Sequence, residues 1–179
     1  MPPSVGGMDP SNILIAGVGG IGCSWAHQAY LRCGMGAHLA LVDADDSSFK
    51  TGENIHVLRL GHALDENGCA ALPPLAEQRM RGLANLTNQL FKSTELVILL
   101  TGLGGGVGTG AAHELARQAR QSGAIVLAVA GLPFDSQPAR AAIAKDGLER
   151  LEHVAHVTVR LSLERLARQA RVRGQIWQM

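Results

Sequence analysis

The chain has 179 residues, enough for one domain with a sizeable core and too few for two of ordinary size. Hydrophobic residues make up 46% and charged residues 17%, which is typical of a globular protein. The net charge of +1 gives no electrostatic argument for a nucleic-acid partner. No secretory signal and no transmembrane segment are visible. The three cysteines have neither metal-ligand nor disulfide-scaffold spacing, so we expect a cytoplasmic protein.

Short apolar runs alternate with longer stretches of helical periodicity, the pattern of a parallel α/β sheet. Strands are expected at residues 12–16, 38–43, 55–60, 95–101, 124–130 and 154–161. Helices are expected at 20–33, 73–91, 109–121, 137–152 and 163–172, with a long loop at 61–72. Continuous apolar runs such as ELVILL indicate strands covered by helices on both faces. The prediction is a three-layer Rossmann-like parallel sheet of about six strands.

In this prediction one domain spans residues 12–173, between a flexible N-terminus (1–11) and a C-terminal tail (174–179). The tail follows a basic amphipathic segment. Such a segment could lie on anionic lipid or dock on a partner, but four arginines on an ordinary surface helix explain the same spacing.

The first strand runs into GVGGIG, residues 17–22, followed by a helix. This is G-x-G-x-x-G in its strand–turn–helix context, where glycines let the backbone approach a phosphate and the helix N-terminus supplies N–H donors. Asp43 ends the next strand about 20 residues later, where a dinucleotide-binding domain places its ribose-binding acid. This half alone would indicate a nicotinamide, a flavin or an adenylate-forming enzyme.

A second glycine loop follows the strand ELVILLT. Six of the nine residues from 102 to 110 are glycine, and the helix AAHELARQAR comes next. Successive N–H groups without side chains form an anion-binding concavity at a helix start, and Thr109 adds a hydroxyl near the N-cap. Tight helix–strand packing would need only one or two glycines. The loop lacks the lysine of a P-loop. Two such loops would hold two parts of one polyphosphate.

GLGGGVGTGAA, residues 102–112, resembles the signature loop of the tubulin/FtsZ family, whose usual form is G-G-G-T-G-[ST]-G. Further resemblances follow in family order: GVGGIGCS at 17–24, Asp43-Ala44, GCAALP at 68–73, GAIVLAV at 123–129, Pro133-Phe134 and GLERL at 147–151. Nearly the whole chain is covered. The resemblance implies a GTP-binding α/β domain that, in the family, precedes a long central helix and a second domain.

The resemblance also implies the roles of individual residues. The first loop would line the α- and β-phosphates with Gly19, Gly20 and Gly22. The second loop would wrap the β/γ end with Gly104, Gly105, Gly106, Val107, Gly108, Thr109 and Gly110. Ala70 and Ala71 would lie near the γ-phosphate, Ser24 near the guanine, and Asp43 in contact with the nucleotide. Pro133, Gln137 and Arg140 belong to the segment that would approach the ribose.

Several positions depart from the family pattern. Val107 replaces a threonine and Ser24 replaces an asparagine. The ribose segment has Ser136-Gln137 where the family carries a glutamate. The chain ends before the family's central helix, which carries the base-stacking aromatic residue, and before the aspartate loop that polarises the attacking water in a neighbouring subunit. Hydrolysis needs a positioned water and charge stabilisation, so GTP binding is favoured over autonomous hydrolysis.

Other residues are candidate ligands. Asp43, Asp45 and Asp46 could hold Mg²⁺ beside phosphates, although Asp45 and Asp46 could equally cap a helix or be solvated. The seven histidines show no metal-ligand spacing and are expected in surface or core roles. Cys23 abuts a helix start, which could lower its pKa, but packing is the favoured role. No catalytic residue and no metal ligand is assigned.

The sequence is compatible with three functions. The leading one is an FtsZ-like protein that binds GTP or GDP with Mg²⁺, with weak or partner-dependent hydrolysis and a role in cell division or filament regulation. Its partner would be itself or an FtsZ-like chain. The second is a Rossmann enzyme that binds NAD or forms an adenylate. The third is a degenerate FtsZ-like interaction module without nucleotide turnover.

Overall fold

The computed structural model describes residues 9–33, 36–61, 69 and 72–172. Its sheet consists of β1 (Ile13–Val18), β2 (His38–Asp43), β3 (Ile55–Arg59), β4 (Leu96–Gly102), β5 (Ile125–Leu132) and β6 (Val157–Ser162). The helices are α1 (Gly19–Cys33), α2 (Pro73–Gly82), α3 (Ala84–Leu90), α4 (Gly106–Gln121), α5 (Pro138–Val154) and α6 (Leu163–Val172). Two 3₁₀ turns, η1 (Pro10–Asn12) and η2 (Asp46–Ser48), complete the described elements.

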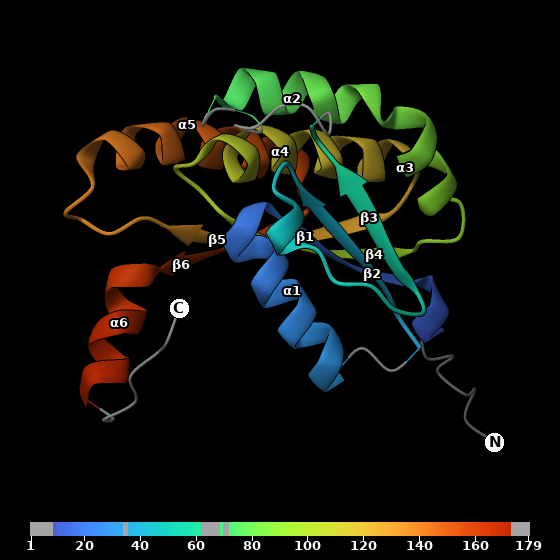
Figure 1. Ribbon diagram of the computed structural model, residues 1–179, viewed down its shortest axis with the longest axis horizontal. Helices are drawn as coiled ribbons and strands as arrows, with labels where there is room; N and C mark the ends of the chain where they lie inside the picture. The colour runs from blue at the N-terminus through green and yellow to red at the C-terminus, as the bar shows by residue number, and fades with distance from the viewer. Residues whose placement is uncertain (1–8, 34–35, 62–68, 70–71, 173–179) are drawn as a thin grey trace.

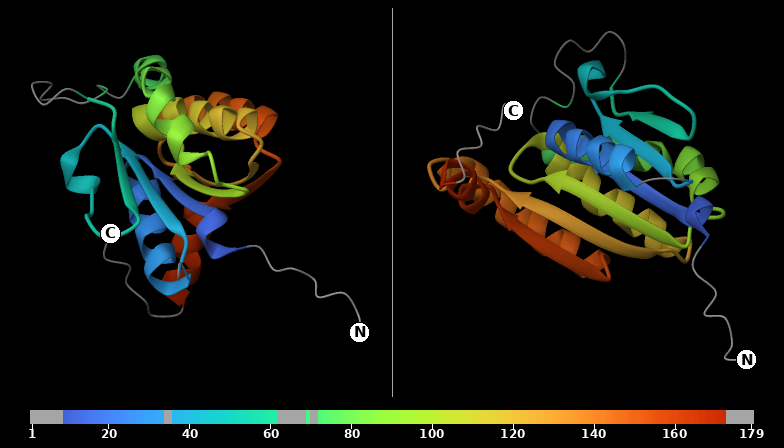
Figure 2. Two further views of the ribbon diagram at one scale, coloured as in Figure 1. Left: turned by 90° about the vertical axis from the view of Figure 1, so that its right-hand side faces the viewer. Right: turned by 90° about the horizontal axis from the view of Figure 1, so that it is seen from below.

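All six strands are parallel, in the order β3-β2-β1-β4-β5-β6. The order reverses between β1 and β4, so the connections before β3, which carry α1 and η2, lie on one face of the sheet, and the connections after β3 cross the other. Figure 1 shows α1 below the sheet, with α2, α4 and α5 stacked above it. The views in Figure 2 agree with this three-layer arrangement. The predicted fold class is therefore confirmed, and the reversal creates a crevice at the carboxyl edge where ligands bind in such sheets.

The main core lies between the sheet and α4. Val97 and Leu99 of β4 and Val126 of β5 face it and are fully buried, together with Leu115 of α4. A smaller cluster, between α1 and the sheet, contains Ile15, Cys23, Ala26, Leu39 and Leu41. Burying apolar area of this kind stabilises the fold by about 25 cal/mol per Å². This core therefore holds β1 and β4, the strands that lead into the two glycine-rich loops.

The two faces of the sheet differ in how well they are covered. Helix α1 packs on β1, β2 and β4, whereas Ile125, Val157 and Val159 on the same face stay exposed. The sequence expectation of strands covered by helices on both faces is therefore wrong for this part of β5 and β6 within the described residues. An apolar run cannot distinguish a covered face from one left open, because both have the same sequence pattern.

Element boundaries also differ from the expectation, and two of these differences are in helices near the glycine loops. The helix predicted over 73–91 is two helices, because Gly82 ends α2 and Leu83 leaves helical geometry at φ −91° and ψ 8°. Helix α4 begins at Gly106 instead of residue 109, so several signature glycines are helical. Glycine is a poor helix former in isolation. Here the close packing of the first helical turn on neighbouring backbone offsets that cost.

Candidate functional site

The two glycine loops lie side by side at the carboxyl edge of the sheet. Strands β1 and β4 are neighbours, and α1 and α4 start directly beyond them. A Cβ added at Gly19 would lie 3.1 Å from the backbone nitrogen of Gly108. The first N–H groups of a helix have no partner within the helix and carry the positive end of its dipole. Two such termini therefore converge on one place.

Backbone conformation requires glycine at two positions. Gly19 has φ +73° and Gly104 has φ +98°, a region that side chains disfavour. At Gly104 a Cβ would also lie 2.9 Å from the carbonyl oxygen of Arg140, at the start of α5. Arg140 thus lies beside the second loop, and its approach to a ribose stays a prediction.

Close packing explains further glycines without a ligand. A Cβ at Gly22 would lie 2.4 Å from the carbonyl oxygen of Leu100, and one at Gly108 would lie 2.1 Å from that of Gly102. A Cβ at Gly110 would lie 1.9 Å from the carbonyl oxygen of Pro73. The sequence argument that packing needs only one or two glycines is therefore wrong. Gly108 and Gly110 both pack against backbone, as does Gly104.

Gly105 and Gly20 are different, because space is open around them. Nothing lies within 4 Å of a Cβ added at Gly105, the N-cap of α4. At Gly20 the nearest atoms, Ser48 Oγ and Asp43 Oδ2, would lie at the ordinary contact distances of 3.9 and 4.0 Å. These two glycines therefore leave room for a ligand to approach the helix starts.

Two threonine hydroxyls hold the second loop in shape. Thr109 Oγ1 accepts a hydrogen bond of 2.9 Å from the backbone N–H of Gly104, and its methyl group packs against Gly147 of α5. The Thr101 hydroxyl lies within hydrogen-bond distance of the carbonyl oxygens of Val18 (3.2 Å) and Gly108 (3.0 Å). Sequence reasoning missed Thr101. The sequence pattern that could have indicated Thr101 is a hydroxyl residue at the end of an otherwise apolar strand, directly before a glycine.

The three aspartates after β2 have different surroundings. The Asp43 carboxylate accepts from the Ser48 hydroxyl (2.5 Å) and from the Ala44 N–H (2.7 Å), and it faces Gly20. Asp45 caps η2 through the Ser47 N–H, and this hydrogen bond lowers the pKa of Asp45. Asp46 is ion-paired with Arg59 at 2.6 Å. Asp43 is therefore the one of these three that stands beside the glycine loops.

The remaining predicted contacts have less support from the geometry. Val107 is half-buried and packs partly against the core. Gln137 is the N-cap of α5 without a side-chain capping bond, and Pro133 is half-buried just beyond β5. Ala70 and Ala71 lie outside the described residues.

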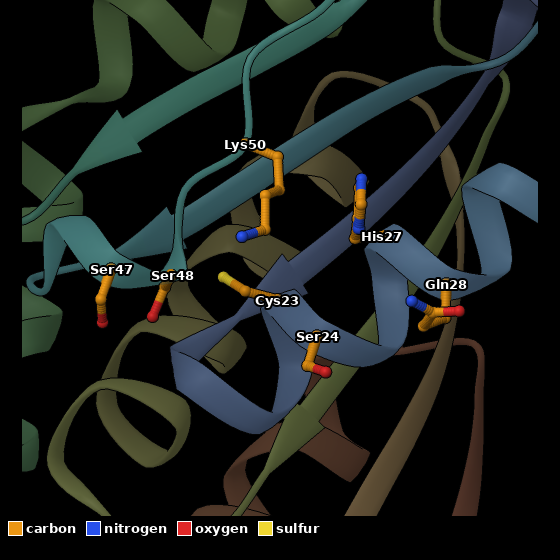
Figure 3. Close-up of a pocket in the computed structure, with 7 residues that line it drawn as sticks. All are labelled: Cys23, Ser24, His27, Gln28, Ser47, Ser48 and Lys50. Carbon is orange, nitrogen blue, oxygen red and sulfur yellow. The ribbon is translucent and has the colours of Figure 1, made fainter. Parts of the chain in front are cut away.

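A polar pocket of about 230 Å³ lies between α1 and η2 (Figure 3). Cys23, Ser24, His27, Gln28, Ser47, Ser48 and Lys50 line it. Ser24 is exposed there, and its contact with a base stays a prediction. Burial and the charge of Asp43 raise the pKa of Cys23 to about 12, so it is a protonated packing residue and not a nucleophile.

A charged cluster joins α2, α4 and α5 behind the second loop. Glu77 is ion-paired with Arg81 and, at 2.7 Å, with Arg150. Burial raises the pKa of Glu77, but the hydrogen bond from Arg150 and the nearby charges outweigh it, so the pKa is lower than usual. Glu114 is fully buried and pairs with Arg117 at 2.6 Å.

Ligand atoms of Glu77, His113 and Glu114 lie within 4.8 Å of one another, a spacing that could hold a metal ion. Arginines already neutralise both carboxylates, however, and burial lowers the pKa of His113. A further cation would meet three arginine charges. The cluster is therefore a structural brace for the helix that carries the signature loop.

The comparisons with known proteins agree with this geometry. The model for the tubulin/FtsZ family GTPase domain matches residues 12–171. Cell division protein FtsZ 1 of Archaeoglobus fulgidus is 34% identical over 156 residues, covering 86% of this chain and 42% of the relative. Cell division protein FtsZ of Aquifex aeolicus is 30% identical over 147 residues, covering 81% and 40%. The chain thus spans about two fifths of the length of these curated relatives.

Solved structures show the same fold. An empty FtsZ dimer from M. jannaschii superimposes with a TM-score of 0.79 at 27% identity, covering 88% of this chain and 47% of that one. CetZ2 from Haloferax volcanii, a GTPγS-bound protofilament, gives 0.72 at 18% identity, which bears on the fold alone. Among the described residues, no helix combines the length and apolar character needed to cross a membrane. The family match and the shared fold together show that this chain belongs to the tubulin/FtsZ family and represents its GTPase domain.

Proposed function

We propose that this chain binds GTP and GDP, with the phosphates held between the starts of α1 and α4. The observation that carries the proposal is the contact between Gly19 and Gly108, which brings two sets of unpaired helix N–H groups to one edge of the sheet. Open space at Gly105 and Gly20 leaves access to both. A polyphosphate is the ligand that such a pair of termini favours.

Mg²⁺ would be held on the Asp43 side of the site. Oxygen ligands suit this ion, and the Asp43 carboxylate faces Gly20 with lone pairs to spare after its two hydrogen bonds. Asp45 and Asp46 are already engaged in a cap and an ion pair. Bound Mg²⁺ would neutralise phosphate charge there.

Hydrolysis by the chain alone is proposed to be weak. Between Gly104 and Gly110 the only residues with side chains are Val107 and Thr109, and the Thr109 hydroxyl is bonded to Gly104. Neither can orient and deprotonate a water. A second polypeptide, another copy or an FtsZ-like chain, would complete the site. By its relatives' names, the process is cell division, and we place the chain in the cytoplasm, where the Cys23 thiol would stay reduced.

Calorimetric titration with GTP, GDP, ATP and NAD tests the binding proposal. Tight binding of GTP and GDP with weak binding of ATP and NAD is expected. A preference for NAD would instead support a dinucleotide-binding enzyme, and no binding of any nucleotide would support an interaction module.

Phosphate release, measured against protein concentration, tests the proposal on turnover. The rate per molecule should stay near background as the concentration rises, and addition of a filament-forming FtsZ should raise it. A rate that climbs steeply with the concentration of this chain alone would contradict weak autonomous hydrolysis.

A further inference from the structure

The two sides of the first glycine loop differ in chemistry. On the β2 side, the Asp43 carboxylate and the Ser48 hydroxyl face Gly20. On the β5 side, Ile21 and Trp25 follow one another at a spacing of four residues and share one flank of α1. The first side suits a metal ion and phosphates, whereas the second suits a flat ligand with apolar faces.

A matched pair of glycines makes room for this flank. Gly102 of β4 and Gly131 of β5 are partners in the sheet register. A Cβ at Gly102 would lie 3.1 Å from Ile21 Cβ, and one at Gly131 would lie 2.7 Å from Trp25 Cη2 and 3.2 Å from Cζ3. The benzo edge of the indole therefore lies against bare backbone at the end of β5. Pro133, two residues further along the chain, belongs to the segment that the family resemblance implies would approach the ribose.

Packing covers only part of the Trp25 indole. It is half-buried, and among the described residues no atom accepts a hydrogen bond from its Nε1. Ile21 beside it is 39% exposed. A large aromatic ring is thus partly open next to a phosphate-binding loop, on the side away from the carboxylates.

We infer that Trp25 is the stacking platform for the base of the bound nucleotide, a proposal that rests on the proposed nucleotide site. With the phosphates at the starts of α1 and α4, the sugar and base must extend along the carboxyl edge. The carboxylate side disfavours an apolar ring, so the base extends toward β5 and meets the indole. Stacking on an aromatic side chain strengthens binding of a base by roughly 10- to 100-fold.

Two measurements test this inference. The chain has two tryptophans, so a Trp177→Phe background makes fluorescence report Trp25 alone. GTP should quench that fluorescence, whereas tripolyphosphate, which has no base, should bind without quenching. In calorimetry, Trp25→Leu should weaken GTP binding by about 10- to 100-fold and leave tripolyphosphate binding unchanged. Trp25→Phe should retain most of the affinity, and Leu31→Ala, at an exposed position elsewhere on α1, should have no effect.

The outcomes separate this inference from the function on which it rests. If the wild type binds neither GTP nor tripolyphosphate, the nucleotide site itself is wrong. If the Trp177→Phe protein binds GTP without quenching and Trp25→Leu binds it as well as the wild type does, the nucleotide site stands and stacking is wrong. Loss of tripolyphosphate binding in a folded Trp25→Leu variant would show that Trp25 shapes the loop, which also overturns stacking. The quenching measurement leaves Trp25 intact and decides the matter even if Trp25→Leu does not fold.

Discussion

Gly105 offers the sharpest test of where the phosphates lie. It is the N-cap of α4, with φ −106° and nothing within 4 Å of an added Cβ. Any side chain can therefore stand there in the ligand-free protein. A Gly105→Trp side chain would occupy the space over the first N–H groups of α4. We expect the fold to be kept and GTP binding to fall at least 100-fold, about 2.7 kcal/mol.

The size of the effect on stability follows from two opposing contributions at Gly105. Removing a glycine restricts the unfolded chain and stabilises by about 0.4–1 kcal/mol. Losing glycine at an N-cap destabilises by a similar amount. The net change for Gly105→Ala should be within about 0.5 kcal/mol. By contrast, the Cβ of Gly108→Ala would lie 2.1 Å from the Gly102 carbonyl oxygen. That backbone must move, at a cost of about 3 kcal/mol.

Urea denaturation and calorimetry distinguish the two glycines. Gly105→Trp should have a near-native circular dichroism spectrum and an unchanged unfolding midpoint, but its GTP binding should be at least 100-fold weaker. Gly108→Ala should lower the melting temperature by about 6–12 °C. If Gly105→Trp folds and binds GTP like the wild type, the phosphates do not lie at the start of α4 and the proposed site is wrong.

Three further predictions concern the groups behind the site. Glu114→Ala should destabilise by about 2–3 kcal/mol in urea denaturation, because it removes a buried carboxylate that pairs with Arg117 and accepts a hydrogen bond from the buried Gln118 amide. Arg168→Ala, which removes an exposed ion pair with Glu164, should change stability by less than about 0.5 kcal/mol. If Glu114→Ala and Arg168→Ala destabilise equally, the charged cluster is not a buried brace. Burial lowers the pKa of His113 in the folded state. The free energy of unfolding should therefore have its full value above about pH 6.5 and decrease as the pH drops below it. His113→Gln should flatten the dependence of the urea midpoint between pH 7 and 5.5, and an unchanged slope would exclude His113 as its source. Cys23, with a pKa of about 12, should resist iodoacetamide at pH 8 until the protein is unfolded, and mass spectrometry showing rapid alkylation of the folded protein would oppose this.

Much of the fold could be predicted because it depends on local pattern. Apolar runs such as ELVILL mark buried strands, and the glycines after β1 and β4 mark turns into helices. The signature GLGGGVGTGAA by itself also indicates the family. The boundaries at Gly82 and Gly106 were missed, because helix ends depend on what packs against them.

The sequence by itself determined an α/β chain with two glycine-rich helix starts and placed it in the tubulin/FtsZ family. Only the tertiary structure decided what each glycine does. Gly105 has open space around it, while Gly108 and Gly110 pack against the backbone of other segments. It also decided that Thr101 ties two loops together and that Trp25 lies against Gly131. The physical reason is that these contacts join segments far apart in the chain. Which backbone approaches a given residue depends on the strand order, and the local pattern does not encode that order.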